Sequence, residues 1–105
     1  MRTTITARHC EVSGELQERA RVVLGRLANH VSGAVTGRVT FDVGPIHQTA
    51  EIRLHAGRDR EYVATAEATD HRTALDRAER KLRRQVEKGS VKPNGRRPRT
   101  GRRSS

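Results

Sequence analysis

The strongest constraint on this chain is an amphipathic stretch, DHRTALDRAERKLRRQVEKG, which covers residues 70–89. Asp70 suits an N-cap, because its carboxylate can accept a hydrogen bond from an unpaired amide of the first helical turn. Gly89 suits a helix stop, because glycine adopts the left-handed conformation without steric cost. Apolar side chains recur between them every three or four residues, at Leu75, Ala78, Leu82 and Val86. The stretch therefore predicts a helix that buries one face against a core.

Basic side chains occupy another face of the same predicted helix. They recur at helical spacing and form a row of cations: Arg77, Arg80, Lys81, Arg83, Arg84 and Lys88. We expect the pairs Asp76–Arg80 and Glu79–Arg83 to add a little helix stability, because side chains four residues apart are neighbours on a helix. An isolated face of this kind is usually just a solvated surface.

The distribution of charge along the chain favours a binding surface over a merely solvated one. The formal net charge is +10, yet residues 1–70 contain nine basic and nine acidic side chains. Residues 71–105 contain thirteen basic side chains against three acidic ones. A neutral body with a concentrated cationic end is typical of a protein that binds nucleic acid.

Composition narrows the class of protein further. A chain of 105 residues is expected to form one domain, and with one Phe, one Tyr and no Trp its core must consist of aliphatic side chains. The same scarcity of aromatic residues argues against single-stranded nucleic acid as the ligand, because its bases usually stack on aromatic side chains.

Cys10 is the single cysteine, which excludes an internal disulfide and fits a reducing compartment. No secretion signal or membrane-spanning run is evident, so we expect a cytoplasmic protein without a membrane partner.

Alternating apolar and polar residues predict four strands, at about residues 3–8, 35–43, 47–56 and 60–68. In the first of these, Ile5 and Ala7 are expected to face inward. A second helix is predicted from Ser13, a favourable N-cap, to about residue 29 or 30. Gly25 lies inside that helix at a cost of about 1 kcal/mol relative to alanine, and one interpretation is a close approach to the sheet.

The predicted order is therefore β-α-β-β-β-α, which indicates an α+β fold. The economical packing is one four-stranded mixed sheet with two helices packed on one face. A right-handed crossover places the first strand parallel to the second, and two short turns make the last three strands an antiparallel meander. The far face of the sheet is expected to be polar and mixed in sign.

Residues 90–105, SVKPNGRRPRTGRRSS, differ in composition from the preceding domain at residues 1–89. They contain six basic side chains, no acidic ones and few apolar ones, so we expect a disordered basic tail. One interpretation is a solubilising tail. The interpretation that we favour is an arm that follows phosphates, with contacts from Lys92 at its start and from Arg96, Arg97 and Arg99.

From about Ile5 to Lys92 the chain resembles the ribosome hibernation-promoting factors, also called ribosome-associated inhibitor A or sigma-54 modulation proteins. The most specific part is EYVATAEATDHRTALDRAERKLRRQVEK, where an alanine-rich strand leads through Glu67 and Asp70 into the basic helix. The start ITARHCEVSGELQERA is similar to the family's opening strand and helix entry. One departure is His71-Arg72, which stands where family members commonly have an apolar and an aromatic residue.

This resemblance implies binding to the 30S ribosomal subunit, alone or within the 70S ribosome, in the channel for messenger and transfer RNA. Occupancy would block translation in stationary phase or under stress. It implies contacts between 16S ribosomal RNA and the basic helix, continued by Lys92, and it implies no cofactor, metal, catalytic residue or small-molecule substrate. The chain resembles the short form of the family, for which we expect a monomer.

Other functions remain open on the sequence alone. A module for double-stranded or structured RNA also places three strands before a basic helix. A transcription-linked regulator that acts through protein contacts is the second alternative. An enzyme is the weakest, because the five histidines show no ligand spacing within one element and no phosphate-binding glycine loop is present.

Overall fold

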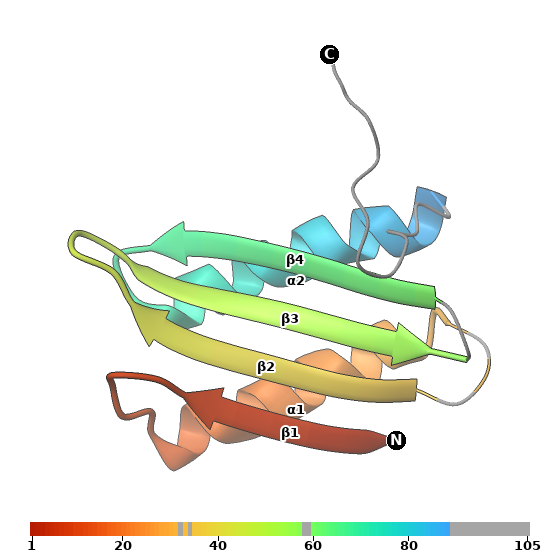
Figure 1. The fold of residues 1–105 in the computed structure, drawn as a ribbon, viewed down its shortest axis with the longest axis horizontal. Coiled ribbons are helices and arrows are strands. Elements are labelled where there is room, and N and C mark those ends of the chain that lie inside the picture. The colour runs from red at the N-terminus through yellow and green to blue at the C-terminus, as the bar shows by residue number, and fades with distance from the viewer. Residues whose placement is uncertain (32, 34, 58–59, 89–105) are drawn as a thin grey trace.

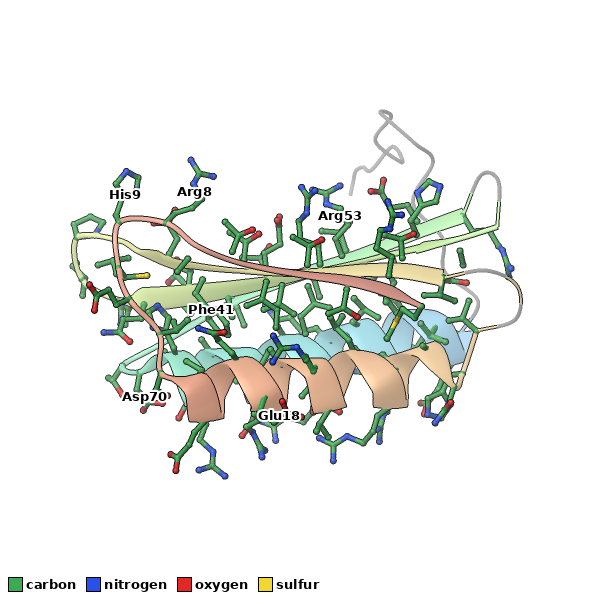
Figure 2. All side chains as sticks on the ribbon, turned by 90° about the horizontal axis from the view of Figure 1, so that it is seen from below. Arg8, His9, Glu18, Phe41, Arg53 and Asp70 are labelled. Carbon is green, nitrogen blue, oxygen red and sulfur yellow. The ribbon has the colours of Figure 1, made fainter. Side chains whose placement is uncertain are left out.

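The computed structural model describes residues 1–31, 33, 35–57 and 60–88, and its elements follow in the predicted order β-α-β-β-β-α. Their bounds are β1 Arg2–Ala7, α1 Gly14–Ala28, β2 Val35–Val43, β3 Gln48–Ala56, β4 Arg60–Ala68 and α2 His71–Lys88. The four strands form one sheet in the order β1-β2-β3-β4, and both helices cover one face of it (Figures 1 and 2). The predicted α+β fold is confirmed. Three elements differ slightly from the predicted boundaries: β1 lies one residue earlier, β3 begins one residue later, and α1 ends at Ala28, one or two residues before the predicted end.

The pairing of the strands also agrees with the prediction. β1 runs parallel to β2, with Ile5 opposite Val39, because α1 carries the chain back between them. β2 and β3 are antiparallel, and so are β3 and β4, with Ile52 opposite both Val39 and Ala64. This arrangement makes β1 and β4 the two edge strands.

The core lies between the sheet and the helices. It combines aliphatic side chains of α1 with alternate residues of the inner strands, around Phe41 (Figure 2). β4 contributes mostly alanines to this layer, at positions 64, 66 and 68, and small side chains there allow α2 to lie close to the strand. Ala7 and Val43, which alternation places on the inner face, are nevertheless exposed, because both stand at the last residue of their strands.

The closest approach between helix and sheet occurs at Gly37 of β2. A Cβ atom added there would lie 2.9 Å from Cδ2 of Leu24, a fully buried side chain of α1. A Cβ atom added at Gly25 would meet no atom within 4 Å. The interpretation of Gly25 as the point of close approach was therefore wrong, and β2 supplies the glycine that this contact requires.

We predict opposite effects for two alanine substitutions at these glycines. Gly37→Ala should lower the free energy of unfolding by about 1–3 kcal/mol, because Leu24 must move within a packed core. Gly25→Ala should raise it by about 0.5–1 kcal/mol, because alanine restricts the unfolded chain and favours the helix. Urea unfolding of both variants measures this difference, and a Gly37→Ala variant as stable as the wild type would contradict the packing described here.

Candidate nucleic-acid interface

The basic helix α2 begins at a well-formed cap. Asp70 accepts two hydrogen bonds from Thr73, one from the backbone amide at 2.8 Å and one from the hydroxyl at 3.1 Å. These hydrogen bonds favour the ionised carboxylate and lower the pKa of Asp70 below its ordinary value. The predicted N-cap is confirmed, and it fixes the first turn of the helix.

His71 anchors the start of α2 to the sheet. Its side chain is buried, and its Nε2 lies 2.9 Å from the carbonyl oxygen of Asp42, which can only accept, so Nε2 donates. Its ring also meets Phe41 edge to face, with the centroids 5.3 Å apart. This role of His71 was not predicted from the sequence. The available signal was periodicity, since His71 lies one turn before Leu75 on the buried stripe.

Ion pairs join α2 to α1 along one side. Arg19 donates to Asp76 at 3.0 Å, and Arg26 donates from two nitrogens to both carboxylate oxygens of Glu79, at 3.2 and 3.3 Å. The predicted Asp76–Arg80 pair is wrong, because Asp76 contacts Arg19 instead. The predicted Glu79–Arg83 contact is present, at 3.7 Å. Two of the three carboxylates of α2 are thus turned toward α1.

Side chains on the other side of α2 hold the edge strand β4. Arg77 donates to the carbonyl oxygen of Glu67 at 2.8 Å, and Lys81 donates to that of Thr65 at 2.9 Å. Gln85 donates to the carbonyl oxygen of Val63 at 2.6 Å. Two cations of the predicted row are therefore engaged with the backbone of the protein itself.

Three other cations of the predicted row make no such contact with β4. Arg80, Arg84 and Lys88 are exposed and stand one helical turn apart, about 6 Å along the axis. Within the residues that the structure describes, none of the three has a hydrogen-bond or ion-pair partner. We call these three residues the outer row. Arg83 is half-buried beside Glu79 and does not belong to it.

The remaining predicted contacts lie outside the described residues. They are Lys92, Arg96, Arg97 and Arg99, together with the helix stop at Gly89 and the division into residues 1–89 and 90–105. The described ranges contain no group of three His, Cys, Asp or Glu side chains that could hold a metal ion. Across those same ranges, every helix is too short or too polar to cross a membrane.

The open face of the sheet is mixed in sign, as predicted. Arg53 donates to Glu61 at 2.7 Å, and this hydrogen bond raises the pKa of Arg53 above its ordinary value. His9 lies 3.2 Å from Asp42 at the end of β2. Figure 2 places Arg8, His9 and Arg53 on this face, opposite the helices. Carboxylates form ion pairs on part of this face, whereas the outer row of α2 has no ion pair within the described residues.

Comparison with known proteins yields one family and two similar structures. The sequence profile of the family described as sigma 54 modulation protein / S30EA ribosomal protein matches residues 3–93. The N-terminal domain of Thermus thermophilus Protein Y is similar, with a TM-score of 0.73 and 23% identity, over 85% of this chain and 99% of that one. A ribosomal subunit interface protein from Coxiella burnetii has a TM-score of 0.72 and 20% identity, over 85% of this chain and 97% of that one. These identities support the fold alone. No curated protein matches the sequence.

The cap of α2 leads to a prediction about pH. Because the folded-state pKa of Asp70 is lowered, its ionised form stabilises the protein above the ordinary pKa, and this contribution is lost as the pH falls through the folded-state value. Asp70→Asn retains a capping oxygen without a titrating charge. The unfolding midpoint of the wild type should exceed that of Asp70→Asn at pH 7, and the difference should shrink below about pH 4. A difference that does not change with pH would contradict this role of the carboxylate.

Proposed function

Because the chain belongs to the sigma 54 modulation protein / S30EA ribosomal protein family, we propose that it is a ribosome hibernation factor. In this proposal it binds 16S ribosomal RNA of the small subunit, in the channel for messenger and transfer RNA, and so keeps idle ribosomes from translating. It acts by occupancy, without a catalytic step or cofactor.

The observation that carries this proposal is the outer row of α2. Arg80, Arg84 and Lys88 are exposed cations on a helix that is held at its start, along α1 and along β4. A helix fixed on several sides presents its charges at set spacings, so less conformational entropy is lost when they meet a ligand. Fixed cations about one helical turn apart suit the regularly spaced phosphates of folded RNA.

The names of the similar proteins support a ribosomal partner. The family is described in part as S30EA ribosomal protein, and the Coxiella burnetii neighbour is a ribosomal subunit interface protein. A position at a subunit interface would bring the body of the protein between RNA surfaces. Competition with other ligands of the channel then follows from the volume of the folded domain.

The chemistry of the outer row explains what would be recognised. Arginine can form two parallel hydrogen bonds to phosphate oxygens, and lysine adds a compact charge. Such contacts fix position and orientation but carry little sequence information. Specificity would therefore come from the shape of folded RNA. We propose that Lys92, Arg96, Arg97 and Arg99 add further phosphate contacts from outside the described residues.

We predict that affinity for purified small subunits depends on salt through the outer row. Each phosphate contact adds about 0.7–0.9 to the slope of log affinity against log salt. Neutralising Arg80, Arg84 and Lys88 together to glutamine should weaken binding and reduce this slope by about 2–3, as measured by filter binding between about 50 and 200 mM salt.

A matched control removes the same charge elsewhere. Arg8, Arg21 and Arg38 are exposed and lie outside α2, so neutralising them to glutamine lowers the net charge equally. The control should keep most of the slope. An equal loss in both variants would reduce the binding to non-specific attraction, and a flat salt response of the wild type would refute the proposed interface.

The two alternative functions predict different binding partners. A general binder of double-stranded RNA would be competed from small subunits by an isolated RNA duplex, whereas the proposed factor would not. A transcription-linked regulator would co-purify with polymerase components without sensitivity to salt. Sedimentation of stationary-phase extract through sucrose should place the proposed factor with 30S and 70S particles.

A further inference from the structure

The hydrogen bonds between α2 and β4 follow a regular pattern. Donors four residues apart on the helix, Arg77, Lys81 and Gln85, reach carbonyl oxygens two residues apart on the strand. Four helical residues rise about 6 Å, and two strand residues advance about 6.6 Å. One side chain per helical turn therefore meets every second carbonyl of the strand.

The carbonyl groups concerned lie on the open edge of the sheet. β4 is the last strand of the order β1-β2-β3-β4 and is nine residues long. In an antiparallel strand, the N–H and C=O groups of one residue point to the same side, and alternate residues point away from the partner strand. An uncovered row of such groups is a template for another strand.

The three donors share an N–H group and not a charge. Gln85 is neutral, yet it makes the same contact as Arg77 and Lys81, one turn further along the helix. If cations were required at these positions for an external ligand, the third position would break the series. The common chemistry is hydrogen-bond donation to β4.

We propose that Arg77, Lys81 and Gln85 form an edge clasp, which closes β4 against an added strand, above all against β4 of a second copy of this chain. It follows that the phosphate contacts of α2 are made by the outer row and not by Arg77 or Lys81. This second part rests on the function proposed above, whereas the first part does not.

A pair of glutamine substitutions separates the two roles. Arg77→Gln/Lys81→Gln removes two charges but keeps an amide donor of the kind that Gln85 already uses. This variant should remain monomeric, should unfold within about 2 °C of the wild type, and should keep the wild-type salt slope for small subunits. Arg80→Gln/Arg84→Gln removes the same charge and should reduce the slope by about 1.4–1.8. Equal losses of slope in the two variants would overturn the assignment of phosphate contacts to the outer row.

The clasp itself is tested by removing its donors. The triple variant Arg77→Met/Lys81→Met/Gln85→Met keeps long apolar stems but leaves the carbonyl groups of β4 without donors from α2. We expect its unfolding midpoint to fall by about 4–8 °C and a dimer to form at high concentration, as measured by light scattering after gel filtration. Lys81→Met/Gln85→Met serves the same purpose with one donor retained, should the triple variant not fold.

A triple variant as stable and as monomeric as the wild type would overturn the clasp. If the wild type failed to bind small subunits, the proposed function and the assignment of phosphate contacts would fall together. The unfolding midpoint and the molecular mass of the triple variant would still decide whether the clasp exists, because neither measurement involves a ribosome.

Discussion

The arrangement of charge in this protein depends on how closely α2 can lie against β4. Alanines line the inner face of the strand, and Ala74 and Ala78 are buried on the helix. Small side chains on both elements let the backbones approach, because protein interiors leave few voids. Only at short range can side chains of α2 reach the carbonyl groups of the strand edge. Larger residues along β4 would lift the helix away and leave that edge open.

The same close packing decides which cations of α2 stay available. The helix is tied along one side to α1 by Asp76 and Glu79, and along the other side to β4 by Arg77 and Lys81. Two carboxylates are thereby drawn away from the outer row, which they would otherwise neutralise. Glu79 is mostly buried and bound by Arg26, so its removal would also leave that arginine without its ion pair. The same set of contacts therefore fixes α2 in place and leaves the outer row exposed.

Much of the fold could be predicted because it depends on local patterns. Alternation identified the inner face of β4, and the caps Ser13 and Asp70 each accept the expected hydrogen bond. Contacts between distant elements could not be predicted in this way. The position of Gly37 opposite Leu24 depends on where α1 crosses β2, and no period within either segment contains that information.

The candidate site illustrates the same limit. Helical spacing correctly placed six basic residues outside the buried stripe, but it could not distinguish a cation that faces solvent from one that faces a strand edge. His71 lay on the apolar period and was missed, because a histidine at a helix start is usually polar surface; here the carbonyl oxygen of Asp42 satisfies its ring. Tertiary structure determines which partner a polar side chain meets. The sequence pattern gives only the direction in which that side chain leaves the helix axis.

Net charge alone therefore overstates the number of cations on α2 that have no partner among the described residues of the protein. Of the six cations predicted to bind RNA there, two donate to backbone carbonyls and one lies beside Glu79. Long side chains with N–H donors suit an edge strand, because their hydrogen bonds occupy backbone carbonyl groups that another chain could otherwise use. Part of the basic character of the helix thus serves the fold. Contacts with an RNA would come from the charges that the protein leaves unpaired.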